Sequence, residues 1–490
     1  MDLIVKTAVA ICSLGLLAAL LCCNFSFNIG VLCGSAILWA IGGFLVGKKE
    51  IARFPLWLFC ISFVFYLLVI FAIQSPQVSD FLFLINSARD FIDGNTTAFH
   101  TTYVNDWPDL CAAGIVDVIM LSIVNKITFI KACQAAASST MCVLAYLILR
   151  EITAETYAQA GSTLLAIFPL FTFSIEMANN QVLSALFCMA SLYLFVRYAQ
   201  QRNALNTSRV ITLAGLMGFF VAIARFIRPD AVLAIIALAI SLLILAFNSY
   251  KNQTAEKPIR LFGAFAPALS ALLIYVVATS LLSLSLHATG IASEEQHGEN
   301  VAFNKLLMGT DLETSGGWSI DYQKLNTQRS QREGVSYREA AMRTIVERIT
   351  DPGYTANLTI KKIQRLWWTN SEAFNLNHLN GNIHAYITAI EKSWVLLLII
   401  ANLALFARLW KRKCTLTETQ YLLPFIGILA LTICAYLLIE VQPRYLYFAY
   451  IIMFILATVA IYELRKSLGE ATTDRAQKHT TITASKTPER

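Results

Sequence analysis

Long apolar runs recur along this chain of 490 residues, and they constrain its fold more than any other feature. Each run approaches the roughly 20 residues that an α-helix needs to cross the hydrocarbon core of a bilayer. With 57% hydrophobic residues, 14% charged residues and a mean hydropathy of +0.60, the sequence predicts an all-α polytopic membrane protein. The twelve predicted transmembrane spans are 3–23, 28–47, 54–74, 130–149, 157–174, 178–196, 209–226, 229–247, 262–285, 392–409, 420–439 and 445–463.

Basic residues orient these spans, because the cytoplasmic loops of membrane proteins are enriched in Lys and Arg. If the N-terminus is cytoplasmic, the basic short loops all lie inside; they are Lys48-Lys49, Arg197/Arg202, Lys251/Lys257, Lys411-Arg412-Lys413 and the tail residues Arg465-Lys466. One further apolar segment, Leu110–Val124, is short and carries Asp117. If it crossed the membrane, every later loop would change sides, so we predict a re-entrant or surface helix there.

This topology divides the chain into four parts in a plasma membrane. Residues 1–285 form a transmembrane catalytic module with a first outer loop at 75–129, and residues 286–391 form a long outer, extracytoplasmic loop. Residues 392–464 are C-terminal transmembrane helices, and the polar tail 465–490 is expected to be disordered in the cytoplasm. In the long loop, the capping box Ser336-Tyr337-Arg338-Glu339 predicts a helix that stops at Asp351-Pro352-Gly353.

A short amphipathic helix is predicted directly after the third span, on the outer membrane surface. Its apolar stripe comprises Phe81, Leu84, Ile85, Ala88, Phe91 and Ile92. Ser79 is its expected N-cap and Gly94 its expected C′ residue. Asp80 lies in the first turn, where the helix dipole stabilises a carboxylate. Asp80 is therefore either a functional carboxylate at the lipid–water boundary or an acidic residue in a favoured helix position. Arg89 on the polar face is a candidate substrate-binding residue.

Two outer turns carry candidate phosphate-binding residues. Arg225 and Arg228 lie where one span ends and the next begins, and Pro229 fits the first position of a helix whose free N–H groups attract anions. The alternative for Arg228 is a guanidinium that extends from a helix end towards water. Arg444, with Glu440 before it and Tyr445 after it, repeats the arrangement at the next-to-last turn. Arg444 is a candidate for the donor phosphate, and Glu440 and Tyr445 are candidate substrate-binding residues. The alternative is a Glu440–Arg444 ion pair that stabilises that turn.

The long outer loop holds three weaker candidates. Lys361 and Arg365 could bind phosphate, although basic side chains beside Trp367 also suit plain anchors at the membrane interface. Trp318 could stack on a sugar ring or close a turn as an aromatic plug.

Charged residues are nearly absent from the middle of the predicted spans and gather at one membrane face. An ion-coupled transporter usually needs ionisable groups inside its bundle, so this distribution favours an enzyme that works at the lipid–water boundary. Nothing in the sequence indicates nucleic-acid binding, a disulfide framework or a Cys/His zinc site.

The order of these motifs resembles the GT-C superfamily of membrane glycosyltransferases. The resemblance is strongest to the bacterial protein O-mannosyltransferase-like and aminoarabinose-transferase-like branch. It rests on Ser79-Asp80-Phe81 with Gly94-Asn95, Arg228-Pro229 after Gly215-Leu216-Met217-Gly218, Met308-Gly309 with Gly317-Trp318, and Glu440 with Arg444-Tyr445. By this resemblance, the protein would take a sugar from a polyprenyl-phosphate donor and invert its anomeric centre.

The resemblance also implies roles for single residues. Asp80 would be the general base that deprotonates the acceptor hydroxyl, which agrees with the need for one carboxylate opposite a leaving phosphate held by cations. The second outer turn reads Ala178-Asn179-Asn180-Gln181 with Glu176 upstream, where this family often has an acidic residue beside Asn. Glu176 and Asn180 are therefore candidate substrate-binding residues, and we expect no metal or other cofactor.

Two alternatives stay open from the sequence. The protein could be a flippase for lipid-linked oligosaccharides or another transporter, and the acceptor could be a protein, a glycolipid or another glycan.

Overall fold

The computed structural model describes residues 2–23, 29–46, 50–202, 207–251, 261–293, 300–319, 321–367, 376, 379, 381–411 and 419–484. Within these residues every regular element is a helix, which confirms the predicted all-α class. Five basic residues used for the topology prediction, Lys48, Lys49, Lys257, Arg412 and Lys413, lie outside the described residues.

The helices of the first half are α1 (Asp2–Cys22), α2 (Ile29–Val46), α3 (Phe54–Ile73), α4 (Ser79–Ile92), α5 (Thr102–Asp106), α6 (Asp109–Ile123), α7 (Ile127–Ile152), α8 (Glu155–Ala166), α9 (Pro169–Phe173), η1 (Ser174–Glu176), α10 (Asn180–Gln201), α11 (Thr207–Ile227) and η2 (Pro229–Ala231). Those of the second half are α12 (Val232–Lys251), α13 (Leu261–Ala288), α14 (Val301–Gly309), α15 (Tyr322–Glu333), α16 (Tyr337–Thr350), α17 (Pro352–Trp367), α18 (Gly381–Lys411), η6 (Gln420–Leu422), α20 (Leu423–Leu438), η7 (Pro443–Leu446) and α21 (Tyr447–Ala484).

Ten helices among the described residues are long and apolar enough to cross a membrane. An eleventh span exists if α8 and the segment Pro169–Glu176 count as one, although they are bent by 52°. The bend follows from Pro169, whose ring and missing N–H prevent α8 from continuing through Phe168. The helix α2 occupies the second predicted span but is not among these ten, so the count of twelve stays a prediction.

Two segments bear on the predicted topology: Leu110–Val124, whose membrane crossing was open, and the C-terminal tail, which was predicted to be disordered. The Leu110–Val124 segment forms α6, whose 15 residues are too few to cross a bilayer as a straight helix. The tail differs, because α21 continues through the predicted disordered region to Ala484. The physical reason is that a long apolar span already supplies the helix nucleus, and the Glu470-Ala471 and Arg475-Ala476-Gln477-Lys478 stretches are good helix formers.

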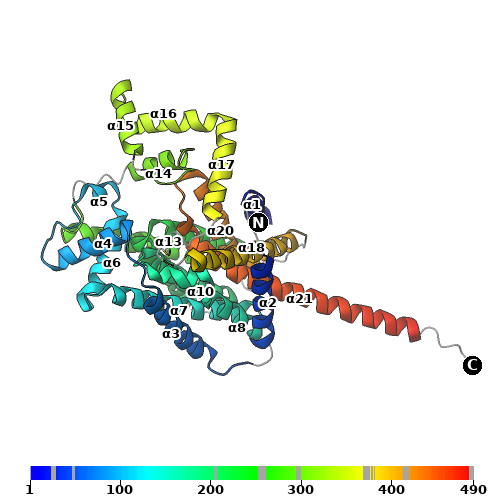
Figure 1. Ribbon diagram of the computed structural model, residues 1–490. Helices are drawn as coiled ribbons and strands as arrows, with labels where there is room; N and C mark the ends of the chain where they lie inside the picture. The colour runs from blue at the N-terminus through cyan, green and yellow to red at the C-terminus, as the bar shows by residue number, and fades with distance from the viewer. Residues whose placement is uncertain are drawn as a thin grey trace, which may run out of the picture.

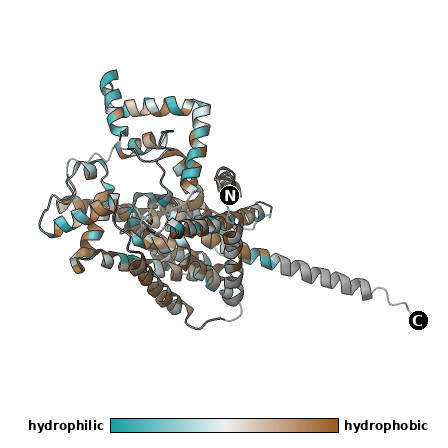
Figure 2. Ribbon diagram, viewed as in Figure 1, coloured by the Kyte–Doolittle hydropathy of each residue, from teal (hydrophilic) through white to brown (hydrophobic). Residues whose placement is uncertain are grey.

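The long loop covers one end of the helical bundle, as Figure 1 shows for α14 to α17, while α21 extends away from the bundle. Figure 2 shows that α15 to α17 carry many hydrophilic residues, whereas the bundle is mostly hydrophobic. Ser336 of the predicted capping box is confirmed as the N-cap of α16, because the Glu339 N–H donates to Ser336 Oγ at 3.2 Å, while the Glu339 carboxylate accepts from Arg343. The predicted stop is also confirmed, since Asp351 accepts from the N–H groups of Gly353 and Tyr354 and so begins α17.

The glycine motif before Arg228 has a packing role. A Cβ atom on Gly218 would lie 2.0 Å from the Ala271 carbonyl oxygen, so only glycine lets α11 and α13 approach this closely. Small residues at helix contacts are typical of membrane bundles, where dispersion contacts replace the hydrophobic effect. This close contact helps to fix the end of α11, from which Arg228 follows.

Candidate active site

A cavity of about 270 Å³ lies where several helix ends meet beneath the long loop. It is bounded by α4, α5 and the start of α6 on one side and by α12, α20 and η7 on the other. The side chains that line it are Asp80, Phe81, Leu84, Tyr103, Trp107, Asp109, Leu110, Asn180, Arg228, Pro229, Asp230, Val232, Leu233, Lys305, Trp318, Ala435, Tyr436, Ile439, Glu440, Gln442, Arg444 and Tyr445. The predicted outer turns thus meet in one place.

Asp80 enters this cavity from the first turn of α4. Its Oδ2 accepts a hydrogen bond from Arg444 Nη2 at 3.0 Å, and its Oδ1 accepts from the Tyr103 hydroxyl at 2.7 Å. Burial alone would raise the pKa of Asp80, but the Arg444 charge and the hydrogen bonds from Tyr103, Arg444 and Ser79 outweigh it and lower the pKa. The carboxylate is therefore ionised at neutral pH.

The backbone before Asp80 differs from the prediction in one respect. Ser79 is the first residue of α4 rather than its N-cap, and its φ of 53° lies in the left-handed region that favours glycine. Its hydroxyl donates to Asp80 Oδ1 at 3.3 Å instead of capping the helix. Backbone strain of this kind is often found beside functional groups. At the other end Gly94, with φ of 101°, confirms the predicted C′ position.

Arg444 reaches Asp80 from η7, close to the C-terminal end of the chain. The side chain is 13% exposed, and its guanidinium lies 4.8 Å from the centre of the Phe81 ring. Gln181 Nε2 donates to the Arg444 carbonyl oxygen at 3.0 Å and fixes the backbone there. The alternative Glu440–Arg444 ion pair is wrong, because the structure pairs Arg444 with Asp80 and Glu440 with Lys305.

Arg228 is held by acceptors on two other elements. Its Nε donates to Asp230 Oδ2 at 2.8 Å and its Nη1 donates to Asn180 Oδ1 at 3.2 Å, while the guanidinium lies 5.1 Å from the Tyr445 ring centre. Tyr436 also donates to Asp230. At 14% exposure, this side chain is buried in a polar cluster and does not extend into water. Pro229 begins the next helical segment as predicted, but the first turn is a 3₁₀ turn, and its Asp230 carboxylate pairs with the Arg228 guanidinium.

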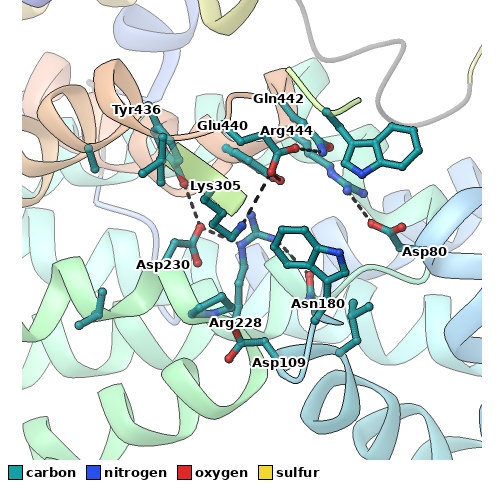
Figure 3. A pocket seen from close by; sticks show the side chains of 18 of the residues that line it. Asp80, Asp109, Asn180, Arg228, Asp230, Lys305, Tyr436, Glu440, Gln442 and Arg444 are labelled. Carbon is teal, nitrogen blue, oxygen red and sulfur yellow. Dashed lines mark hydrogen bonds and ion pairs between the residues drawn. The ribbon is translucent and has the colours of Figure 1, made fainter. Parts of the chain in front are cut away.

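Lys305 of α14 supplies a third cation that the sequence did not reveal. Its ammonium group lies 3.8 Å from Glu440 Oε2 and 5.3 Å from the Trp107 ring centre. Glu440 itself is 3% exposed and also accepts hydrogen bonds from Gln442 at 2.7 Å and Tyr445 at 3.3 Å. Figure 3 shows Arg228, Lys305 and Arg444 around the same space.

Several predicted binding residues do not line this cavity. Arg89 donates to Asn125 at 3.3 Å on the far side of α4. Glu176 is fully buried and forms an ion pair with Lys131 at 3.0 Å, which holds η1 against α7. Arg225 does not line the cavity either, but it forms an ion pair of 2.9 Å with Asp109, which does.

The candidates on α17 also lie away from the cavity. Arg365 donates to the Thr314 carbonyl oxygen at 3.1 Å, and Lys361 is half-buried outside the lining. Trp318 does line the cavity and is 47% exposed, so it is available for a ligand.

Lys362, which lies between Lys361 and Arg365 on α17, connects the long loop to the segment before Glu440 by hydrogen bonds. Its buried ammonium group donates to the carbonyl oxygens of Gly309 at 2.9 Å, Leu437 at 2.9 Å and Ile439 at 2.8 Å. Gly309 must be glycine, because a Cβ atom there would lie 2.4 Å from the Ile439 carbonyl carbon. The Met308-Gly309 motif therefore brings α14, with Lys305, against the segment that precedes Glu440.

Comparison with known proteins adds a family to this geometry. A family model described as dolichyl-phosphate-mannose-protein mannosyltransferase matches residues 115–275, about a third of the chain. This match supports a membrane glycosyltransferase of the GT-C superfamily. No curated protein matches the sequence. In this glycosyltransferase the matched stretch contains Asn180 and Arg228, while Asp80 and Arg444 lie outside it.

The glycosyltransferase cavity contains residues that sequence reasoning missed. Asp230 was visible two positions after Arg228, and its spacing at a helix start suits an ion pair. Gln442 lies within the Glu440–Tyr445 turn, two positions after its partner Glu440. Tyr103 and Lys305 belong to no motif, and only the folded chain brings them to Asp80 and Glu440. Among the described residues, no three His, Cys, Asp or Glu side chains form a group that could hold a metal ion, and the absence of a metal stays a prediction.

Proposed function

We propose that this membrane glycosyltransferase transfers a sugar from a polyprenyl-phosphate donor to an acceptor hydroxyl, with inversion at the anomeric carbon. The observation that carries the proposal is the ionised carboxylate of Asp80 in a cavity with the cations Arg228, Lys305 and Arg444. The other carboxylates that line this cavity are each paired with a different cation: Asp109 with Arg225, Asp230 with Arg228 and Glu440 with Lys305. The Asp80 carboxylate fits the base of a direct displacement, in which one base activates the acceptor and no covalent sugar–enzyme intermediate is needed. The family match supports this reaction class over the transporter alternative.

The reaction is a single displacement. Asp80 removes the proton of the acceptor hydroxyl as that oxygen attacks the anomeric carbon. The bond from that carbon to the phosphate oxygen breaks, and its electron pair leaves with the polyprenyl phosphate. The cations stabilise the growing charge on this leaving group, which is where fixed electrostatic groups contribute most to the rate.

Arg444 links the two halves of this reaction. It contacts the base at 3.0 Å, so a donor phosphate that binds Arg444 competes with the Asp80 carboxylate for the same guanidinium. Transfer of Arg444 from Asp80 to the phosphate would remove a charge that lowers the pKa of Asp80. The base would then become stronger only when a donor is present.

The cavity also suits the lipid part of the donor. Leu84, Leu110 and Leu233 contribute an apolar wall beside the charged groups. A hydrocarbon chain that comes from the bilayer stays in an apolar environment against this wall and packs there by dispersion contacts. The donor would lie with its phosphate at the cations and its first isoprene units against these leucines.

We also propose that this site faces the extracytoplasmic side of a plasma membrane, and that the finer resemblance is to the protein O-mannosyltransferase-like and aminoarabinose-transferase-like branch. The basic short loops support this orientation. In a cysteine-free background, a cysteine at the exposed Thr327 should react with a membrane-impermeant reagent added to intact cells. Protection until the cells are opened would contradict this sidedness.

The donor is tested with the purified protein in proteoliposomes and a panel of radiolabelled polyprenyl-phospho-sugars. We expect label to move to an acceptor for at least one donor, together with release of polyprenyl phosphate. No transfer from any member, with intact protein, would contradict the proposed function.

A further inference from the structure

A second, polar groove lies next to the catalytic cavity. It has a volume of about 400 Å³, within the roughly 300–1,000 Å³ typical of ligand clefts. Its walls come from the end of α5, from α14 and α15, and from the start of α16, which lie together in Figure 1. The lining residues are Asp106, Asn300, Asn304, Gln323, Lys324, Thr327, Gln328 and Tyr337.

The groove is partly built before any ligand arrives. Gln323 Nε2 donates to Asp106 Oδ2 at 3.0 Å, which joins α15 to α5. The Tyr337 hydroxyl donates to Asn304 Oδ1 at 2.8 Å, and Asn304 is 2% exposed. These contacts fix the orientation of the amide groups at its base. On the rim, Thr327 and Gln328 are exposed and make no side-chain hydrogen bond within the described residues.

Residues that are neighbours in the sequence line the groove and the cavity. Asp106 faces the groove while the next residue, Trp107, lines the cavity; Asn304 and Lys305 are divided in the same way. The short helix α5 also carries Tyr103, which donates to Asp80. A molecule in the groove would thus lie beside α5, the helix whose Tyr103 hydroxyl contacts Asp80.

We propose that this groove binds the acceptor, and that the acceptor is a glycan; the inference rests on the proposed function. Asn and Gln each offer both a donor and an acceptor, which matches hydroxyl groups that also act as both. Peptide-binding grooves instead use an exposed strand edge or apolar side-chain pockets. The lining here contains no aliphatic side chain, and its sole aromatic residue, Tyr337, presents its hydroxyl to Asn304.

The test measures binding without a donor, so that it does not depend on transfer. The probes are tetrasaccharides of mannose, glucose and N-acetylglucosamine, titrated into the purified full chain in a detergent without a sugar headgroup and followed by saturation-transfer NMR. The variant is Thr327→Ala combined with Gln328→Ala, two exposed positions where alanine preserves the helix. The matched control is Leu325→Ala on the same helix, at a side chain that is 61% exposed and does not line the groove.

We expect at least one tetrasaccharide to bind the wild type, with affinity reduced about tenfold in the double variant and unchanged in Leu325→Ala. No binding to the wild type, or equal binding to the double variant, would overturn the proposal. A third result would also overturn it. In that result an octapeptide rich in Ser and Thr binds the wild type but not the double variant, and no tetrasaccharide binds. Failure of the proposed function would appear separately, as absent transfer in the radiolabel assay with glycan binding intact.

Discussion

The carboxylate of Asp80 and the guanidinium of Arg444 form an ion pair of 3.0 Å that joins the start of α4 to η7, across 364 positions of sequence. The pair holds together the residue proposed as base and a residue proposed to bind the donor phosphate. Its consequence is that neither residue acts alone, and the first predictions follow from this coupling.

Removal of the Arg444 charge should shift the pH dependence of transfer. Arg444 lowers the pKa of Asp80, so the wild-type rate should stay constant as pH falls until it drops through that lowered pKa. In Arg444→Gln the pKa of Asp80 rises, and the loss of activity in acid should begin at higher pH. The measurement is kcat/KM against pH; an acid limb at the same pH in both proteins would show that Arg444 does not tune Asp80.

Arg228 should contribute directly to donor affinity. Loss of a charge-assisted hydrogen bond typically costs about 1.5–3 kcal/mol, so Arg228→Ala should weaken donor binding roughly tenfold or more. Arg89→Ala is the matched control, because Arg89 contacts Asn125 outside the cavity. Equal donor affinities in the two variants, measured with a fluorescent polyprenyl-phospho-sugar, would assign Arg228 a structural role with Asp230 and Asn180.

Lys362 should stabilise the packing of the long loop against the end of α20, whereas Lys361 should not. Lys362→Met removes the donor to three carbonyl oxygens, and each buried acceptor left unsatisfied costs about 1–3 kcal/mol. We expect faster proteolysis between residues 301 and 367 and a lower Tm. Lys361→Met is the control, because the half-buried Lys361 side chain makes no such contact with the residues that the structure describes. Equal proteolysis rates in the two variants would contradict this role.

Asp117 on α6 should make stability depend on pH. Burial raises the pKa of Asp117 to about 8, so the folded protein binds more protons than the unfolded chain between the ordinary carboxyl range and pH 8. The free energy of unfolding contributed by this group therefore falls as pH rises through that window. Asp117→Asn stays neutral, so its Tm should exceed that of the wild type by more at pH 8 than at pH 5. The same Tm difference at both pH values would contradict a protonated Asp117.

The sequence predicted what depends on local patterns. The apolar runs defined the helices, the Ser336 capping box defined the start of α16, and the α4 stripe is confirmed by buried Phe81, Leu84, Ile85 and Ala88. Local patterns also placed Arg228 and Arg444 at helix ends. They could not show which end groups meet, because those contacts depend on how the whole bundle packs.

The errors have the same origin. Glu440 and Arg444 are one helical turn apart, which made an ion pair between them a reasonable alternative, but Lys305 and Asp80 from distant elements are the partners found. Glu176 was an isolated acidic residue in the sequence, and its burial against Lys131 is a tertiary contact without a local signal.

The substitution Asp80→Asn tests the central claim most directly. It keeps the size of the side chain and can still accept from Tyr103, but it removes the basicity, and loss of a general base typically costs about 10²–10⁴-fold in rate. We predict a protein that inserts normally and still binds the polyprenyl-phospho-sugar, with transfer reduced by that factor. Transfer in proteoliposomes at more than about a tenth of the wild-type rate would contradict the assignment of Asp80 as the base.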